Sequence, residues 1–213
     1  IITRGNGGKV TSAQAIKQGI AADGGLFVPE TLPVFSEPEL REMLGMSYSE
    51  RAVHILGKFL CDYSEEELSG YCEKAYSEEN FRSGGTPAPV INLNDRISVL
   101  ELYHGPTSAF KDMALQLMPY LLAGALEKTG EKRDAFILTA TSGDTGKAAL
   151  AGFADVPGTK IIVFYPKHGV SPIQEKQMVT QRGENTYVIG IEGNFDDAQT
   201  GVKKMFSDAA LAE

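Results

Sequence analysis

The apolar positions in the first part of the chain recur with the spacing of helices. Within residues 12–20 and 36–82, apolar side chains stand three or four positions apart, so each set falls on one face of a helix, whereas residues 26–28 between them are predicted as a short strand that Pro29 ends. Helix starts are predicted at Thr11 or Ser12, at Ser47 and at Ser64, because Ser and Thr accept hydrogen bonds from the first N–H groups of a helix. Residues 1–90 are therefore predicted to form a mostly helical N-terminal domain.

From residue 134 onward, the pattern changes to short apolar runs that alternate with helical spacing. We predict strands at 135–140, 160–165 and 186–191, and helices near 145–154, 171–181 and 195–208. Short apolar strands that alternate with helices favour a parallel sheet with right-handed crossovers. Residues 134–213 are therefore predicted to be a small parallel α/β domain with three βα units.

The segment between these regions begins with two glycines and two prolines within residues 83–95, which predict a linker. A strand is predicted at 97–103, followed by a turn and by a helix that Thr107 or Ser108 would cap. Pro119 is expected to kink that helix, because proline has no N–H group to donate. Residues 91–133 thus form the third predicted domain.

Composition limits the classes of partner. The 213 residues carry a formal net charge of −8, which disfavours a nucleic-acid-binding surface. No apolar run approaches the roughly 18 residues of a membrane span. Cys61 and Cys72 lack metal-type spacing, so we expect two buried or partly buried free thiols and no metal site. The sequence predicts a cytoplasmic protein that binds neither nucleic acid nor membrane.

Lys111 is the first candidate for chemistry. It is predicted to lie near the start of a helix, where the positive end of the helix dipole disfavours an ammonium group. A lysine with a lowered pKa presents a free amine that can form a Schiff base and transfer protons. Position alone nevertheless favours an ordinary surface lysine.

A second stretch strengthens the case for chemistry. Residues 141–146 read Thr-Ser-Gly-Asp-Thr-Gly, between a predicted strand and an Ala-rich helix. Backbone N–H groups at such a helix start, together with the three hydroxyls, form a cradle for an anion. A nucleotide-binding P-loop is disfavoured, because Thr141 replaces its first glycine and Ala148 replaces its Mg²⁺ ligand.

Several motifs together resemble the threonine synthase family. These enzymes use pyridoxal 5'-phosphate (PLP) and share the tryptophan-synthase-β fold. The two main motifs are His-Gly-Pro-Thr-Ser-Ala-Phe-Lys-Asp at 104–112 and Thr-Ser-Gly-Asp-Thr-Gly at 141–146. Further similar stretches lie at 3–5, 23–30, 165–178 and 193–199. The resemblance covers essentially the whole chain, and it implies that the family's chains continue beyond Glu213 with a C-terminal remainder of the catalytic domain.

The resemblance implies an α/β fold class: a helical N-terminal domain, then part of a PLP fold type II catalytic region that includes the small parallel-sheet domain. It also implies a carbon–oxygen lyase that converts O-phospho-L-homoserine and water into L-threonine and phosphate. Lys111 matches the catalytic lysine that carries the cofactor. The resemblance assigns the cofactor to Lys111, Phe110 and Asp144, and the substrate to Thr141, Ser142, Gly143, Thr145 and Gly146.

Other roles are less specific. Lys167 and Ser171 are expected at another strand end and are candidates for the substrate phosphate, although a solvated loop is the commoner explanation. Phe110 either packs on the cofactor or belongs to the core. His104 either reaches the site or closes its own turn, and His54 is predicted to be structural.

Two alternatives to threonine synthase stay open. One is a PLP-dependent phospholyase that acts on an O-phospho amino acid without forming threonine. The other is a catalytically incompetent fragment with only a structural role. The second is considered because no Gly-rich cluster that could hold the cofactor phosphate is found in residues 150–213. Residues 1–213 alone are therefore expected to be inactive.

Overall fold

The computed structural model describes residues 1–3 and 8–207, and these fall into two compact units. The helical unit comprises Ile1–Pro87 with Tyr120–Lys132, and the sheet unit comprises Ala88–Pro119 with Arg133–Glu213. The predicted division into three domains, with boundaries at residues 90 and 133, stays a prediction, because the two compact units follow a different division of the chain and do not test it. The predicted last helical residue, 208, lies outside the described residues.

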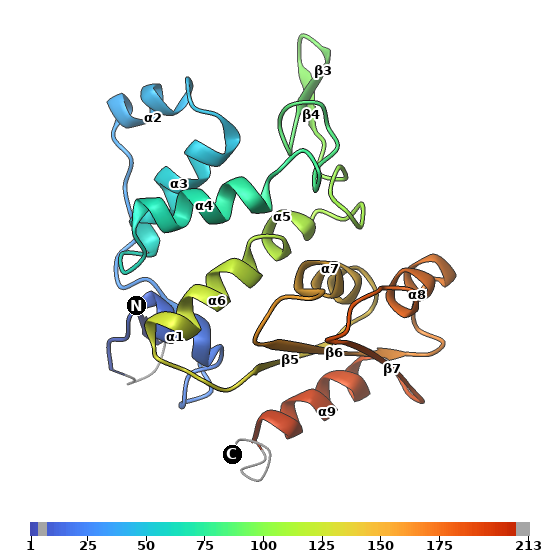
Figure 1. The fold of residues 1–213 in the computed structure, drawn as a ribbon. Coiled ribbons are helices and arrows are strands. Elements are labelled where there is room, and N and C mark those ends of the chain that lie inside the picture. The colour runs from blue at the N-terminus through green and yellow to red at the C-terminus, as the bar shows by residue number, and fades with distance from the viewer. Residues whose placement is uncertain (4–7, 208–213) are drawn as a thin grey trace. The chain divides into compact units, whose positions relative to one another are not determined.

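The helical unit confirms the helix pattern of the first part of the chain. Its elements are β1 (Ile2–Thr3), α1 (Ser12–Gln18), β2 (Phe27–Val28), α2 (Glu37–Met43), α3 (Tyr48–Phe59) and α4 (Glu65–Ala75). Each of α1 to α4 opens with a capping box, in which the first Ser or Thr and a Gln or Glu three residues later satisfy each other's N–H groups. Helices α3 and α4 lie side by side (Figure 1).

The core of the helical unit lies under α4. Leu68, Cys72 and Ala75 recur at helical spacing and are fully or almost fully buried. The Tyr63 hydroxyl donates a 2.8 Å hydrogen bond to the Leu121 carbonyl, which ties residues 120–132 to this unit. Both cysteines are free thiols, as predicted, but Cys61 is exposed rather than buried.

The sheet unit confirms the predicted α/β class. Strands β5 (Ala135–Ala140), β6 (Thr159–Pro166) and β7 (Thr186–Ile191) form a parallel sheet in the order β5-β6-β7. The following helices are α7 (Asp144–Phe153), α8 (Pro172–Val179) and α9 (Phe195–Ser207). Helices α7 and α8 lie on one face of the sheet, and α9 covers the other face (Figure 1). The carboxyl ends of β5 and β6 are therefore neighbours.

Small residues on α7 allow close packing on both sides of this helix. A Cβ atom at Gly146 would lie 2.5 Å from Cγ2 of Thr141 and 2.8 Å from Cγ1 of Val163 in the central strand. Gly152 lies directly against the Leu115 carbonyl, at the end of α5 (Asp112–Leu115). The glycines thus bring α5 against the helix that begins at the 141–146 loop.

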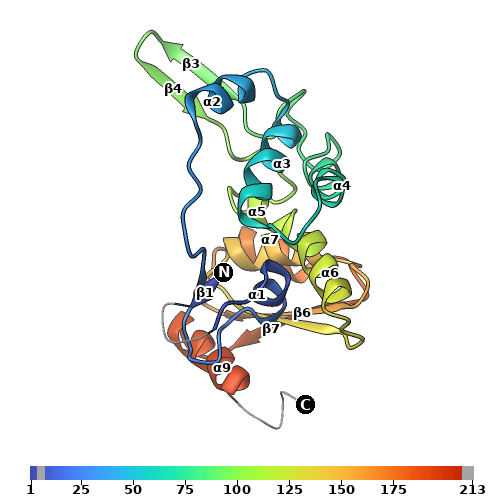
Figure 2. The ribbon, with the colours of Figure 1, turned by 90° about the vertical axis from the view of Figure 1, so that its left-hand side faces the viewer.

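The middle of the chain departs from prediction in three ways. Residues 90–94 are not a linker but β3 (Val90–Asn94), which pairs antiparallel with β4 (Ile97–Leu100) as an isolated two-stranded ribbon (Figure 2). The turn forms because Asn94 Oδ1 accepts hydrogen bonds from two following N–H groups.

The other two departures concern the helix after the turn. Pro119 does not kink one helix but occupies the first turn of a new one, α6 (Met118–Lys128), where no intrahelical N–H bond is needed. Neither Thr107 nor Ser108 caps α5; its N-cap is Lys111, and no side chain caps it in the described part of the chain. No helix formed by residues 1–3 and 8–207 is long and apolar enough to cross a membrane.

Candidate active site

The turn that carries Lys111 is built around a buried carboxylate. Asp112 is fully buried and accepts hydrogen bonds from the N–H group and the hydroxyl of Thr107, at 2.9 and 2.7 Å. Gly105 approaches so closely that a Cβ atom there would lie 2.5 Å from the Asp112 carboxylate. Ser108 takes a left-handed backbone conformation, with φ of 56°. Asp112 therefore holds the turn together and fixes the backbone of its neighbour Lys111.

The Lys111 side chain extends over an exposed aromatic ring. Its Nζ atom lies 4.6 Å from the centroid of the Phe110 ring, within the range of a cation–π contact. Phe110 is 59% exposed, which contradicts the alternative that it belongs to the core. The amine and a flat apolar surface are thus presented together, as a site for a planar aromatic ligand requires.

The 141–146 loop is closed by Thr141. The Thr141 hydroxyl is buried and accepts hydrogen bonds from the N–H groups of Gly143 and Gly146, at 3.0 and 2.9 Å. Gly143 takes a φ of 140°, which L side chains rarely adopt. It is the N-cap of α7 and has no side chain, and Thr141 bonds the third N–H group of the helix, that of Gly146, in its place. Within the described residues, the N–H groups of Asp144 and Thr145 are left for an anion or a ligand oxygen.

Asp144 is an ionised carboxylate at neutral pH. Its Oδ1 atom accepts a 2.8 Å hydrogen bond from Gln174 Nε2 and lies 3.2 Å from Nζ of Lys147. The hydrogen bond from Gln174 lowers the pKa of the carboxyl most, Lys147 adds to this effect, and the Lys111 ammonium contributes more weakly, while partial burial opposes them. The pKa of the Asp144 carboxyl therefore lies below its ordinary value.

Gln174 and Lys147 were missed by the sequence analysis. Lys147 is only 7% exposed, although lysine rarely lies inside without a partner. Its spacing of three residues from Asp144 on one helix was a usable signal. Gln174 contacts Asp144 from 30 residues away. No pattern in the sequence marks that contact.

Three other candidate residues have local partners. Lys167 forms an ion pair of 2.6 Å with Glu192, and the Ser171 hydroxyl accepts the Gln174 N–H group as the N-cap of α8. His104 contacts Glu101 at 2.8 Å and stacks on Tyr103. The site residues named from the sequence therefore all lie in the sheet unit, and their roles stay predictions.

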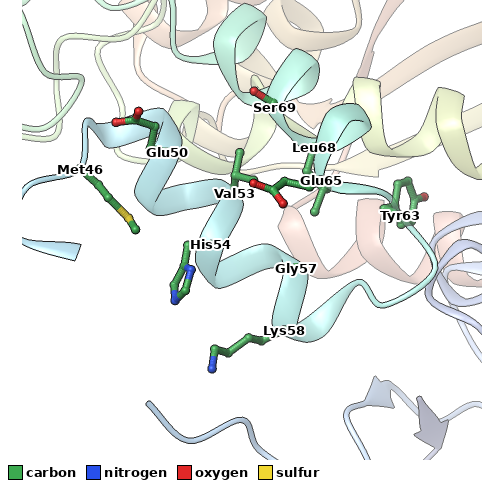
Figure 3. Close-up of a pocket in the computed structure, with 10 residues that line it drawn as sticks. All are labelled: Met46, Glu50, Val53, His54, Gly57, Lys58, Tyr63, Glu65, Leu68 and Ser69. Carbon is green, nitrogen blue, oxygen red and sulfur yellow. The ribbon is translucent and has the colours of Figure 1, made fainter. Parts of the chain in front are cut away.

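A hollow of about 580 Å³ lies elsewhere, along α3 and α4 of the helical unit (Figure 3). Its lining includes Val53, Leu68 and His54, and none of the predicted site residues. His54 Nε2 is buried and has no hydrogen-bond partner within the described residues. In Figure 3 the Glu50 side chain points away from His54 and Lys58, so the polar groups do not converge on one ligand.

Comparison with known proteins identifies relatives for almost the whole chain. Residues 1–76 match the family described as threonine synthase N terminus. The threonine synthases of Pseudomonas aeruginosa and Escherichia coli are each 40% identical to this chain, over 98% and 95% of its length. A crystal structure of PLP-bound threonine synthase from Brucella melitensis superposes with a TM-score of 0.88 at 36% identity, over 98% of this chain. The chain spans only 44%, 45% and 44% of these three relatives.

Proposed function

We propose that this chain, which matches the N-terminal portion of threonine synthases in sequence and fold, supplies the lysine-bearing part of a threonine synthase active site. The proposed reaction converts O-phospho-L-homoserine and water into L-threonine and phosphate. The observation that carries this proposal is that one compact unit holds both Lys111 and the 141–146 loop, in a chain that superposes on a PLP-bound threonine synthase with a TM-score of 0.88.

The residues present fit PLP as the cofactor. Lys111 would hold its aldehyde carbon, the exposed Phe110 ring would cover part of its flat surface, and Asp144 would accept a hydrogen bond from its ring hydroxyl. Both partners of Asp144 contact Oδ1, so Oδ2 is open within the described residues. When bound, PLP supplies an electron sink that makes the loss of a proton beside the substrate nitrogen feasible.

The residues of the chain would perform the proton transfers and bind the substrate. The Lys111 amine is the natural group to take a proton from a substrate carbon and to return one later. The exposed Ser142 hydroxyl and the first two N–H groups of α7, those of Asp144 and Thr145, would bind the substrate carboxylate. Lys167 stands as a candidate for the substrate phosphate.

Replacement of the lysine tests this assignment. In the natural full-length protein, Lys111→Ala is expected to abolish both covalent PLP attachment and threonine formation. Lys203→Ala, on the exposed side of α9, is the matched control and should leave both unchanged. Threonine formation that persists in Lys111→Ala would remove Lys111 as the cofactor-bearing residue. Phosphate release without threonine in the unaltered protein would instead indicate the phospholyase alternative.

We further propose that residues 1–213 alone do not form threonine. The loop between β7 and α9 is the nearest candidate for holding the cofactor phosphate, but carboxylates already occupy it. The Asn194 N–H group donates to Asp197 Oδ2 at 2.8 Å and is therefore not free to bind a phosphate, and the Asp197 carboxylate would repel one. The Glu192 carboxylate is paired with Lys167 at 2.6 Å. Tight PLP retention after dialysis, or phosphate release from O-phospho-L-homoserine, would contradict this proposal.

A further inference from the structure

We propose that Gln174 is a positioning residue of the Lys111–Asp144 site, because its amide joins the loop after β5 to the loop after β6 and fixes the orientation of Asp144. The inference rests on the proposed function as far as catalysis is concerned. The hydrogen bond between Gln174 and Asp144 is present whichever reaction the protein catalyses.

Both ends of the Gln174 amide form a hydrogen bond, and both bonds are satisfied by the same orientation of the amide. Its Oε1 atom accepts the Ser171 N–H group at 3.1 Å, and its Nε2 atom donates to Asp144 Oδ1 at 2.8 Å. A flipped amide would face an N–H donor with its own N–H₂ group and a carboxylate with its own oxygen. The amide therefore has one satisfied orientation, in which it bridges two loops at neighbouring strand ends.

The backbone of the Asp144 loop is shaped around this amide. Gly143 lies directly against the Gln174 side chain, and any Cβ atom at Gly143 would overlap it. The contact explains why a glycine with a positive φ precedes Asp144 at the start of α7. The amide thus fixes the loop backbone by packing as well as the carboxylate by hydrogen bonding.

Fixing Oδ1 determines what Asp144 offers to a ligand. Gln174 and Lys147 both contact Oδ1, which directs Oδ2 away from them. The charged groups that act on Asp144 are Lys147 on α7 and Lys111 before α5, and Gln174 supplies the neutral donor from α8. On the same helix, the Glu175 carboxylate is engaged by the Tyr165 hydroxyl. Loss of the Gln174 donor should let the carboxylate turn and weaken its contact with the cofactor ring.

A single substitution separates this role from helix capping. Gln174→Glu keeps an acceptor for the Ser171 N–H group, because Glu is as suitable as Gln at this position of a capping box. It removes the donor to Asp144 and places two carboxylates side by side, so one of them must bind a proton at higher pH. The matched control is Gln14→Glu, since Gln14 closes the same kind of capping box with Thr11, and its side chain bonds to no carboxylate among residues 1–3 and 8–207.

Two readouts test the substitution in the natural full-length protein. In the cofactor-free protein, carboxyl NMR should show the Asp144 pKa raised by about one unit or more in Gln174→Glu. With PLP bound, the acid limb of the cofactor absorbance and of kcat/KM should move to higher pH by a similar amount. Near neutral pH, kcat/KM should fall about tenfold to a hundredfold, as for loss of a hydrogen bond to a charged group. Gln14→Glu should change none of these.

A double substitution restores the bond with donor and acceptor exchanged. Asp144→Asn combined with Gln174→Glu should retain more PLP than the product of the two single losses predicts, because the new amide can donate to the new carboxylate. If Gln174→Glu alone does not fold, recovery of folding in the double variant supports the same coupling, and failure to recover it overturns the proposal. Additive losses, or a Gln174→Glu protein whose Asp144 titration and cofactor spectrum match the unaltered protein, would reduce Gln174 to a capping residue. Failure of the unaltered protein to form threonine would instead count against the proposed function.

Discussion

The described helices begin in two different ways. In the helical unit, α1 to α4 each satisfy their first N–H groups with a capping box made by their own residues. In the sheet unit, α8 and α9 do the same, and the N–H groups of α5 bond to the backbone carbonyls of residues 109–111. Helix α7 instead begins after a glycine, and within the described residues a side chain bonds only its third N–H group. A helix whose start is already satisfied is complete without a ligand, whereas the partly open start of α7 lies at the loop to which the proposed function assigns the substrate.

Helix α8 combines both arrangements. It opens with the Ser171–Gln174 capping box, yet the same glutamine reaches Asp144 in the neighbouring loop. A local stabilising motif is thereby used to hold a site residue. A closed helix start, in which side chains bond the first N–H groups, should contribute to stability. An open start, in which some N–H groups are left, should contribute to ligand binding.

The largest expected effect on stability comes from adding a methyl group at Gly146, behind the 141–146 loop. Gly146→Ala would place a Cβ atom 2.5 Å from a Thr141 methyl carbon, so the loop must shift or the core must expand. We expect a loss of about 1–3 kcal/mol in the free energy of unfolding, measured by urea denaturation, and weaker PLP binding. Gly70→Ala in α4 is the control, because nothing lies within 4 Å of the added atom. It should be neutral or stabilise by up to about 1 kcal/mol.

Ser142→Ala should affect binding without affecting stability. Its side chain is exposed at the open start of α7, so its loss removes a donor to the substrate carboxylate. We expect substrate affinity to fall by about 1.5–3 kcal/mol with little change in PLP affinity, measured by substrate titration of the PLP-loaded full-length protein. Equal losses for cofactor and substrate would show that the loop binds the cofactor phosphate instead.

Ser64→Ala should show the opposite behaviour. The Ser64 hydroxyl accepts the Glu67 N–H group at 3.1 Å and closes the start of α4. Its removal is expected to cost about 1 kcal/mol of unfolding free energy and to leave ligand binding unchanged. Thermal denaturation and PLP titration of the same sample measure both quantities. A change in PLP affinity would break the distinction between closed and open helix starts.

The smallest effect concerns the thiols of the helical unit. Burial raises the pKa of the Cys72 thiol to about 11, whereas Cys61 is exposed. The thiolate is the reactive form, so iodoacetamide at neutral pH should modify Cys61 alone in the folded protein. Peptide mass spectrometry locates the label. Modification of Cys72 at a comparable rate would show that the core of this unit opens readily.

Much of the architecture follows from local rules. Strands β5 and β7 have the bounds predicted from apolar runs, and β6 differs by one residue at each end. The 141–146 loop and the candidate lysine were also located from the sequence, because motif residues lie close together in the chain. The ribbon of β3 and β4 was less predictable, because its residues are exposed and do not belong to a buried face. Its turn depends on one side chain, that of Asn94, which accepts a hydrogen bond from the Arg96 N–H group.

The sequence by itself determined the helical character of the first part of the chain, the alternating strands and helices from residue 134 onward, the parallel α/β class and the motifs that resemble threonine synthases. These depend on periodicity and on neighbours within a few positions. Only the tertiary structure decided that Asp112 is a buried support, that Phe110 is exposed and that Gln174 holds Asp144. Each of these depends on which distant groups share a space after folding. The ionisation of Asp144 is decided there too, because its pKa depends on the donors and charges that α8 and the Lys111 turn bring to one carboxylate.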